Sequence, residues 1–215
     1  VIVVGAGIAG LSAAWELQKA GYQVEVLEKA DQVGGRISSQ NVDGFVWERG
    51  AQIFLSGYSN VILLLREFKM VSDIRRLKSE LTIASHGRFY HYADHFRSFL
   101  QRPGLFGWWD ALKVLAFRLR FREALFRRSI SDLLLWHDFD RVSFACILRS
   151  WLTPKFVNCL IEPQVLGFFA DRIDSVSSAL GMILSSFTVR GLQNFTLRGG
   201  LQKLPLTMAK SLNVK

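Results

Sequence analysis

The first thirty residues alternate between apolar runs and glycine turns. Residues 1–4 are apolar and β-favouring and end at Gly5, which predicts a strand buried on both faces, as in parallel sheets. Residues 11–20 are rich in helix formers with apolar positions at helical spacing, and Gly21 stands where a helix C-cap belongs. Residues 22–28 alternate into a second strand. The pattern therefore predicts strand, glycine turn, helix and strand in immediate succession.

The pattern becomes mostly helical between residues 55 and 190. Residues 58–70 carry apolar positions three and four apart, which predicts a helix. Residues 81–92 alternate around Ser-His-Gly and predict a hairpin. Residues 110–136 are helical by length and composition, with a break expected near Ser129. We find no internal repeat in this region.

Two later segments contain residues that are typical of turns and helix starts. In residues 162–182 a proline and a Gly-Phe-Phe run precede an acidic turn and a helix, which Asp174 or Ser175 could cap. In residues 195–212 a Gly-Gly turn leads to a helix with an apolar face, and a further strand is expected after it.

Composition narrows the class of protein. The chain has 215 residues, 50% of them hydrophobic, which suits a globular protein of one or two domains and excludes a disordered one. The net charge of +9 suits an anionic cofactor, an anionic substrate, a membrane surface or nucleic acid, without choosing among them. No apolar run reaches the roughly 18 residues that span a bilayer. No secretory signal is visible, and the initiating Met is absent, so the N-terminus looks clipped.

The two cysteines, Cys146 and Cys159, are thirteen residues apart and form no CxxC motif. We interpret them as small buried hydrophobes in a reducing compartment. We therefore expect a cytoplasmic protein, with membrane association left open.

The first glycine turn has the spacing G-x-G-x-x-G. Gly5 permits the tight turn, Gly7 lets the backbone approach a pyrophosphate, and Gly10 lets the helix pack closely on the strand. The free N–H groups at the helix start, with the positive end of its dipole, suit phosphates. The candidate cofactor-binding residues here are Gly5, Ala6, Gly7, Ile8, Ala9 and Gly10.

An acid follows at the expected distance. Glu28 lies 18 residues past Gly10, at the end of the second strand, where it can accept hydrogen bonds from a ribose hydroxyl. A negative charge there disfavours the 2′-phosphate of NADP. We include its neighbour Lys29 in the candidate site. The alternative is a glycine turn without a ligand, but strand, helix, spacing and acid all agree on a dinucleotide. These features alone leave FAD and NAD open.

The segments "EKADQVGGR" (28–36) and "DGFVWERGAQIF" (43–54) resemble the flavin-binding signature of the flavin amine oxidase superfamily. This superfamily holds monoamine and polyamine oxidases, protoporphyrinogen oxidase and phytoene-desaturase-like enzymes. The resemblance implies FAD as the cofactor.

The residues of these segments fit that interpretation. Gly34 and Gly35 let the backbone run close to a ligand, and Arg36 can offer a fork of donors to a phosphate; the alternative is a surface arginine in a glycine loop. In the superfamily the second segment passes near the flavin ring, so Gly50 and Ala51 would present backbone to it. We interpret Glu48 as a local structural acid without a chemical role.

The two later segments extend the resemblance. Residues 162–182 look like the protoporphyrinogen oxidase and desaturase pattern, although Asp171-Arg172 stands where the former more often have Gly-Asp. Residues 195–212 resemble the return of the chain into the flavin domain.

The resemblance implies an α/β protein. A Rossmann-like FAD-binding domain of the GR2 type would carry an inserted, largely helical α+β substrate domain. We expect residues 1–55 and 191–215 in the flavin domain and residues 56–190 in the insertion. Superfamily members are about twice as long, so we expect a truncated, N-terminal half that alone binds FAD poorly and has no turnover.

The implied function is that of an FAD-dependent oxidoreductase that removes hydride equivalents from an organic substrate, nearest to protoporphyrinogen oxidase. A carotenoid or phytoene desaturase, a polyene isomerase and an amine oxidase remain alternatives. So does a non-catalytic binding protein on the same fold, although the intact Gly10, Glu28 and Arg36 argue against lost FAD binding. The partner would be an apolar or porphyrin-like small molecule. We nominate no catalytic side chain, because the flavin would carry the chemistry, and the oligomeric state stays open.

Residues 113–128 mix arginines with Leu and Phe. This pattern suits either peripheral membrane contact or an ordinary helix whose arginines extend over core residues, and it favours the latter. Nucleic-acid binding is disfavoured, because no recognised module accompanies the charge. His91 and His95 are four apart, which suits a metal only on a helix, and the glutamate of HExxH is missing. We expect no metal site.

Overall fold

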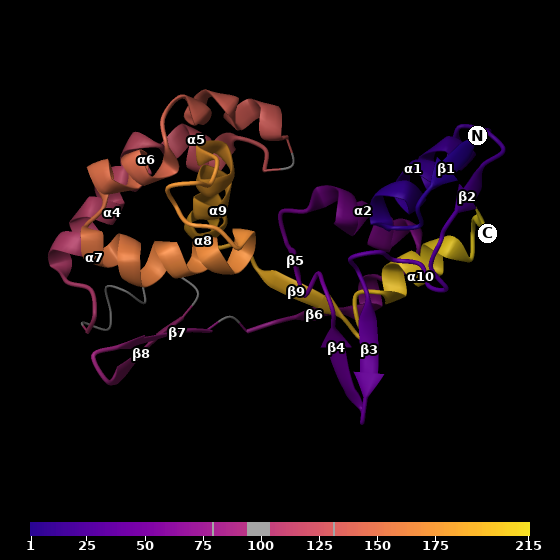
Figure 1. Ribbon diagram of the computed structural model, residues 1–215, viewed down its shortest axis with the longest axis horizontal. Helices are drawn as coiled ribbons and strands as arrows, with labels where there is room; N and C mark the ends of the chain where they lie inside the picture. The colour runs from indigo at the N-terminus through magenta and orange to yellow at the C-terminus, as the bar shows by residue number, and fades with distance from the viewer. Residues whose placement is uncertain (79, 94–103, 131) are drawn as a thin grey trace. The chain divides into compact units, whose positions relative to one another are not determined.

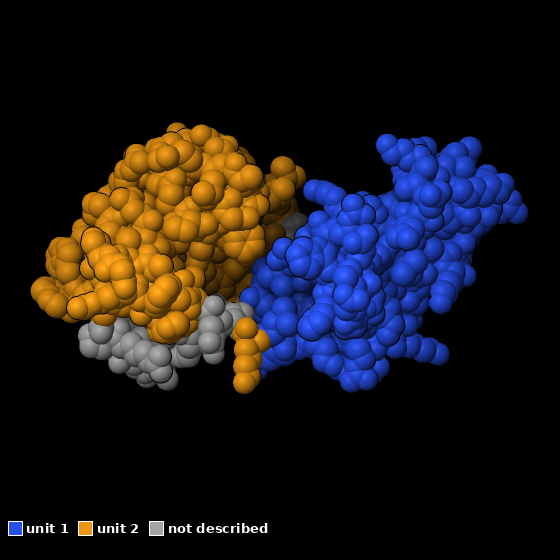
Figure 2. All heavy atoms as spheres, turned by 60° about the horizontal axis from the view of Figure 1, so that its bottom comes forward, with its two compact units in different colours: residues 1–77, 193–215 blue, residues 78–192 orange. Residues whose placement is uncertain are grey.

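The structure is a computed structural model that describes residues 1–78, 80–93, 104–130 and 132–215. The chain forms two compact units (Figure 2). Unit 1 comprises Val1–Leu77 and Gln193–Lys215, and unit 2 comprises Lys78–Leu192. Residues 56–77 therefore pack with the N-terminal residues of the chain.

Unit 1 begins with the strand, helix and strand that the sequence predicts. Strand β1 (Ile2–Val4) leads to helix α1 (Ile8–Lys19) and then to strand β2 (Glu25–Leu27), which pairs with β1 in parallel. The last strand of the chain, β10 (Asn213–Val214), pairs in parallel with the other edge of β2. The sheet order is thus β1-β2-β10.

The expected burial of β1 on both faces is wrong for the described chain. Ile2 is 65% exposed and Val4 is 83% exposed. Val3 packs instead against the cluster that contains Leu11 and Ala14 of α1. Because successive side chains of a strand point to opposite faces, the helix covers the Val3 side only.

Two antiparallel arrangements complete unit 1 (Figure 1). One is a hairpin of β3 (Ser39–Val42) and β4 (Phe45–Glu48), and the other is a small sheet of order β5-β9-β6. Its strands are β5 (Phe54–Leu55), β9 (Asn194–Leu197) and β6 (Ile74–Arg76). The remaining elements are α2 (Ser59–Glu67), the 3-10 turn η1 (Val71–Asp73) and α10 (Lys203–Ala209).

These elements confirm two sequence predictions. The helix expected within residues 58–70 is α2, and the Gly-Gly turn is followed by helix α10 and strand β10. One buried cluster joins the elements of unit 1; among its members are Leu11, Val26, Leu65, Leu204 and Met208.

Unit 2 opens with the predicted hairpin. Strands β7 (Glu80–Ser85) and β8 (Arg88–Ala93) pair in antiparallel register. The two turn residues, His86 and Gly87, both have positive φ, at 51° and 72°. Two successive positive φ values suit the tight turn of a two-residue hairpin.

The rest of unit 2 is helical. Its elements are α4 (Trp108–Arg120), α5 (Arg122–Arg127), η2 (Leu133–Arg141), α6 (Phe144–Trp151), α7 (Pro154–Phe156), η3 (Val157–Ile161), α8 (Glu162–Phe169) and α9 (Ser178–Arg190). Of these, η2 is a 3-10 helix and η3 a π-helical turn. Among the residues that the structure describes, no helix is long and apolar enough to cross a membrane.

The expected break near Ser129 is confirmed, because α5 ends at Arg127 with its C-cap at Arg128. The helix also bends at Phe121, between α4 and α5, which the sequence did not predict. The Arg190 guanidinium donates to the carbonyls of Leu125 and Arg128, both at 2.6 Å, and so takes up free carbonyls at the end of α5. The indole of Trp136, wholly buried, donates to the Ser129 carbonyl at 2.7 Å and fixes the following turn.

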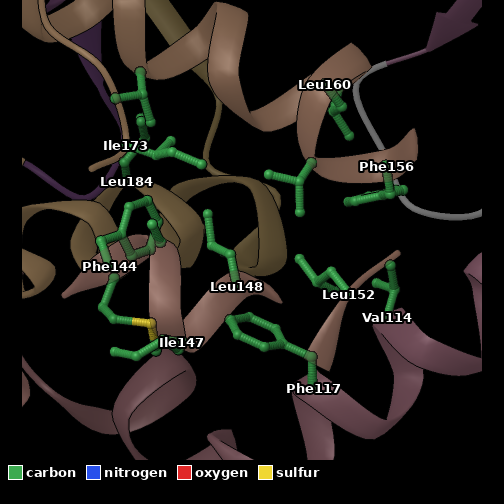
Figure 3. Packing of buried hydrophobic residues seen from close by; sticks show 14 of the residues in the cluster. Val114, Phe117, Phe144, Ile147, Leu148, Leu152, Phe156, Leu160, Ile173 and Leu184 are labelled. Atoms are coloured by element: carbon green, nitrogen blue, oxygen red, sulfur yellow. The ribbon is translucent and has the colours of Figure 1, made fainter. Parts of the chain in front are cut away.

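The core of unit 2 is a single apolar cluster (Figure 3). Phe117 of α4 points toward Leu148 of α6, and Val114, Phe144 and Leu184 belong to the same buried cluster. The cap of α9 differs from the prediction, because Ser177 rather than Asp174 or Ser175 stands at the N-cap.

Candidate dinucleotide-binding site

The first glycine turn is built by close packing. Gly5 has φ of +97°, and its N–H donates to the Leu27 carbonyl at 2.7 Å. A Cβ on Gly10 would stand 2.0 Å from the carbonyl oxygen of Gly5. Any side chain at Gly10 would therefore push α1 away from the turn, as the sequence predicts for the third glycine of the motif.

The start of α1 offers free donors beside open space. Gly7 is the N-cap and supplies no side-chain hydrogen bond, so the N–H groups of Ile8, Ala9 and Gly10 lack a side-chain cap. No described heavy atom lies within 4 Å of where a Cβ on Gly7 would stand, leaving out its chain neighbours. A helix N-terminus with N–H groups next to unfilled space suits an anion such as a pyrophosphate.

Glu28 directly follows β2 and binds the same turn. Its Oε2 accepts the N–H of Ala6 at 2.6 Å, and its Oε1 accepts the N–H of Ala30 at 3.0 Å. These bonds, Ala6 first, hold the pKa of the Glu28 carboxyl below its ordinary value, so the group is ionised at neutral pH. Each carboxylate oxygen keeps a further lone pair that can accept a hydroxyl.

The glycine pair makes a contact that the sequence did not reveal. The Gly34 N–H donates to the Ala6 carbonyl at 2.8 Å, and Gly7 and Gly34 form an isolated parallel bridge. A Cβ on Gly34 would stand 2.3 Å from the Ile37 carbonyl oxygen, and one on Gly35 would lie 3.4 Å from the Gly7 Cα. The pair thus lets two loops meet backbone to backbone.

A third segment joins at Arg36. The Arg36 carbonyl accepts the N–H of Ala51 at 2.9 Å. A Cβ on Gly50 would stand 2.1 Å from the same oxygen, so only glycine fits. The Arg36 side chain is exposed beside this junction, and so is that of Lys29 near Glu28. The structure therefore brings the three predicted segments, 5–10, 28–36 and 50–51, together in unit 1.

A surface cavity of about 370 Å³ opens next to Glu28. Of the predicted residues, Glu28 and Gly35 line it, and the Arg49 guanidinium side chain adds a positive charge to its wall. The other lining residues are Ala30, Asp31, Gln32, Val33, Ser38, Gln40 and Gln202. Sequence reasoning missed Arg49, because an exposed arginine beside a strand carries no signal of its own.

A hydrogen-bond network fixes the far wall of this cavity. Glu48 accepts the N–H of Leu201 at 2.8 Å and the hydroxyl of Ser39 at 2.7 Å. Gln202 is buried, accepts the N–H of Ser39 at 2.9 Å and donates to the Val33 carbonyl at 3.0 Å. Glu48 is thus a structural acid with one partner nearby, Ser39, and a second, Leu201, that lies 153 residues away. The sequence did not predict Gln202 as a site residue, because its position after the Gly-Gly turn is the only indication that the sequence gives.

Of the two histidines four residues apart, only His91 is described, and it does not lie on a helix as the metal pair would require. His91 lies on strand β8, where its Nδ1 is 2.9 Å from the Thr82 hydroxyl, and His95 lies outside the described residues. Within the described part of the chain, no group of three His, Cys, Asp or Glu side chains could hold a metal ion.

The fold is that of an α/β protein with a parallel strand-helix-strand unit, and the candidate site lies at the glycine turn of that unit. The family "Flavin containing amine oxidoreductase" matches residues 8–215, and the chain belongs to this family. Its cofactor is accordingly a flavin, in agreement with the sequence prediction.

The relatives include enzymes of several substrate classes. Coproporphyrinogen III oxidase of Propionibacterium freudenreichii is 34% identical over 82% of this chain and 33% of the relative. 15-cis-Phytoene desaturase of Narcissus pseudonarcissus is 33% identical over 67% of this chain and 22% of the relative. A solved variant of putrescine oxidase, 26% identical, covers 100% of this chain and 49% of its own with a TM-score of 0.74. The chain thus spans half or less of the length of these relatives.

Proposed function

We propose that this chain supplies the ADP-binding part of the FAD site in an FAD-dependent oxidoreductase. The observation that carries the proposal is the backbone contact between the Gly34–Gly35 turn and the Gly5–Gly10 turn, with ionised Glu28 bound to the latter. This contact creates a fixed rim around an anion-binding helix start and a hydroxyl acceptor. ADP offers the matching groups, a pyrophosphate and a ribose.

Different residues of the site would bind different parts of the cofactor. The N–H groups of Ile8, Ala9 and Gly10 would bind the pyrophosphate, and Glu28 would bind the ribose hydroxyls. Arg36 would meet a phosphate oxygen, while Gly50 and Ala51 would present backbone toward the flavin ring. When bound, FAD supplies the redox chemistry by accepting a hydride equivalent from the substrate. The protein side chains position it.

We assign residues 1–55 and 191–215 to the flavin-binding part, which is Rossmann-like, and residues 56–190 to the substrate-binding part, of which residues 56–77 pack within unit 1. An apolar cavity of about 60 Å³ lies within unit 2, well below the roughly 300–1,000 Å³ of a small-molecule pocket, so the assignment of the substrate to this part of the chain rests on the family resemblance. Phe117, Phe144 and Leu148 line this cavity, with Gln164 as a polar neighbour.

The substrate that we place first is porphyrinogen-like. The similarity to coproporphyrinogen III oxidase extends over most of the chain, and a net charge of +9 suits propionate groups. Phytoene-like polyenes, for a desaturase or an isomerase, and amines are the other candidate substrates. A non-catalytic binding protein is the alternative of another class.

The test uses the natural protein that contains this chain, purified without added flavin. We expect visible flavin absorbance near one equivalent, and at least tenfold weaker FAD binding for Glu28→Gln, because the amide loses the charge and one acceptor. Glu16→Gln, at an exposed site on α1, is the matched control and should bind as the parent does. A folded protein that takes up no FAD would exclude the cofactor assignment.

Anaerobic mixing of the flavinated protein with a porphyrinogen, a polyene or an amine then identifies the substrate class. Bleaching of the flavin by the porphyrinogen is the expected result. Bleaching by one of the others would replace our first choice. Bound flavin that none of the three reduces would favour the isomerase or the binding protein, and isomerisation of a polyene would separate these two.

A further inference from the structure

The turn of the β7–β8 hairpin borders a surface cavity of about 370 Å³ in unit 2. Four of its lining residues have side chains that can donate hydrogen bonds, namely His86, Arg88, Tyr90 and Lys155. Gly104 and Leu105 complete the lining. Because no Asp or Glu is among these lining residues, the wall of the cavity carries positive charge that no acid of the wall offsets.

Arg88 lies on the face of the hairpin that packs on the core. Side chains two residues apart in a strand share a face, so Arg88 shares one with Tyr90 and Tyr92. Tyr92 belongs to the buried cluster of unit 2, and Tyr90 packs against that cluster. Phe89, on the opposite face, is 71% exposed. At this end of the hairpin the arginine is thus on the core side and the phenylalanine meets water, which reverses the usual preference of the two residue types.

His86 occupies an unusual backbone position in the turn of the same hairpin. Its φ of 51° lies in the left-handed region, where glycine or asparagine is the common residue of such a turn. The Nδ1 of its ring lies 2.9 Å from the Ser85 hydroxyl, so Nε2 is the ring atom that can meet a ligand. A side chain that is present at a strained position supports a role for that side chain.

The wall formed by Gly104 and Leu105 is fixed to strand β8. The N–H of Leu105 donates to the hydroxyl of Tyr92 at 3.2 Å, and both residues are buried. A Cβ on Gly104 would stand 2.9 Å from Cδ1 of the Tyr90 ring, so the backbone packs directly against this ring. Packed backbone therefore bounds the cavity on this side.

The cations of the cavity are available to a ligand. Within the described part of the chain, neither Arg88 nor Lys155 forms an ion pair with an acid. Asp110 does not line the cavity, although its partner Thr153 lies two residues before Lys155. Its carboxylate is buried, where it accepts the N–H of Gly107 at 2.8 Å and the Thr153 hydroxyl. Two such cations beside an imidazole and a phenol favour a ligand with two negative charges.

We propose that this cavity binds a phosphate group of a small-molecule ligand. The Arg88 guanidinium would bind two of its oxygens and the Lys155 ammonium a third, while the phenol and the imidazole add donors. A phosphate suits this set because it offers three oxygens in different directions and carries roughly two negative charges at neutral pH, whereas the guanidinium alone would satisfy a planar carboxylate. The volume lies within the range of small-molecule pockets, so the cavity has room for more than the phosphate.

The experiment measures phosphate binding to the natural protein that contains this chain, with excess FAD present to occupy the candidate dinucleotide-binding site. Isothermal titration calorimetry with inorganic phosphate gives the affinity, and amide exchange mass spectrometry locates the site. We expect phosphate to slow exchange in residues 86–92 and 153–157. Arg88→Gln and Lys155→Gln should each weaken binding about tenfold, because each removes a charge-assisted hydrogen bond, and Arg88→Lys should weaken it less than Arg88→Gln because it keeps the charge.

The matched control is Arg141→Gln, which removes an exposed arginine of η2. It lowers the net charge as much as Arg88→Gln does but lies away from the cavity lining, so it should bind phosphate as the parent does. Circular dichroism verifies that each variant is folded. The location of the slowed exchange separates this proposal from the flavin assignment, because the two sites share no residue.

Two further probes identify the source of the phosphate. Glycerol 3-phosphate should bind at least as tightly as inorganic phosphate and slow exchange in the same residues. Phosphatidylcholine vesicles that contain phosphatidic acid should not bind the protein. If they bind it and the double variant Arg88→Gln with Lys155→Gln abolishes this binding, a lipid headgroup replaces the small molecule.

Four outcomes would overturn the proposal. One is an unchanged phosphate affinity of the folded double variant, and another is the failure of both inorganic phosphate and glycerol 3-phosphate to bind. The third is slowed exchange confined to residues 5–10 and 28–36, which would place the phosphate in the dinucleotide-binding site. The fourth is succinate binding as tight as that of phosphate, which would make the cavity a carboxylate site.

Discussion

Gly7 and Gly10 belong to one motif, but we expect Gly10 to matter for the stability of the fold and Gly7 for the binding of FAD. A Cβ on Gly10 would overlap the Gly5 carbonyl oxygen, whereas one on Gly7, whose φ of −71° any residue can adopt, would enter open space. We expect Gly10→Ala to lower the free energy of unfolding by about 2–3 kcal/mol, since the helix must shift. Denaturant titration measures this loss.

The matched variant at this site is Gly7→Ala. It should cost less than about 1 kcal/mol of stability, the difference between glycine and alanine at an N-cap, yet weaken FAD binding because the methyl group occupies the approach of the pyrophosphate. If Gly10→Ala proved as stable as Gly7→Ala, the packing argument would fail.

At the residue scale, the sequence predicted those site residues whose role depends on neighbours within the same strand-helix-strand unit. The spacing of Gly5, Gly7 and Gly10 and the position of Glu28 follow from one strand-helix-strand unit, so they could be predicted. Arg49 and Gln202 could not be, because their places in the site depend on a loop and a turn far apart in the chain.

At the scale of single elements, helix α9 depends on a remote cap. Ser177 is its N-cap, and Asp140 of η2 accepts the Ser177 hydroxyl at 2.7 Å and the Ala179 N–H at 3.0 Å. We expect Asp140→Ala to destabilise the protein by about 1–2 kcal/mol, since an N–H at the helix start loses its acceptor. Thermal or urea unfolding measures the loss.

The pH dependence of this effect has a definite sign. The Ala179 N–H, before the other contacts, holds the pKa of Asp140 below its ordinary value. The stabilisation is therefore complete above the ordinary pKa of a free Asp and disappears as the pH falls through the lower value of the folded state. Asp140→Asn, which keeps an acceptor but no charge, should lose less stability than Asp140→Ala and show a flatter acid limb. A gap between parent and Asp140→Ala that persists at low pH would contradict this account.

Hydrophobic periodicity predicted where helices and hairpins occur, because it reports which face meets the core. It predicted the break near Ser129, where α5 ends, but not the bend at Phe121. It also did not identify Arg190 of α9, which donates to the carbonyls at the end of α5, because nothing in residues 110–136 indicates that partner. The N-cap Ser177 was missed for a similar reason, since the sequence suggested Asp174 or Ser175, and the bonds of Asp140 to Ser177 and Ala179 come from η2, a distant element.

At the scale of the whole chain, Glu48 ties the end of unit 1 to its beginning. Its carboxylate bridges the Leu201 N–H and the Ser39 hydroxyl. Glu48→Ala leaves both donors without this acceptor, so we expect a loss of about 1–3 kcal/mol and faster amide hydrogen exchange in residues 195–212. Exchange mass spectrometry locates the change.

Two controls accompany this measurement. Glu48→Gln retains one acceptor and should have a smaller effect, and Glu67→Ala, at an acid of α2 bound to Trp15 and Lys19, should leave residues 195–212 unchanged. Equal exchange in Glu48→Ala and the parent would show that the rest of the core holds this segment in place.

The sequence by itself determined the strand-helix-strand unit, the glycine positions, the acid at the end of β2 and the flavin family, because each depends on neighbours within a few residues or on a local signature. Only the tertiary structure decided why Gly34 and Gly35 are glycines, which residues wall the cavity beside Glu28, and which face of α4 meets water. These depend on distant segments that come together in folding, and the identity of such partners is not written in the local pattern of apolar and polar residues.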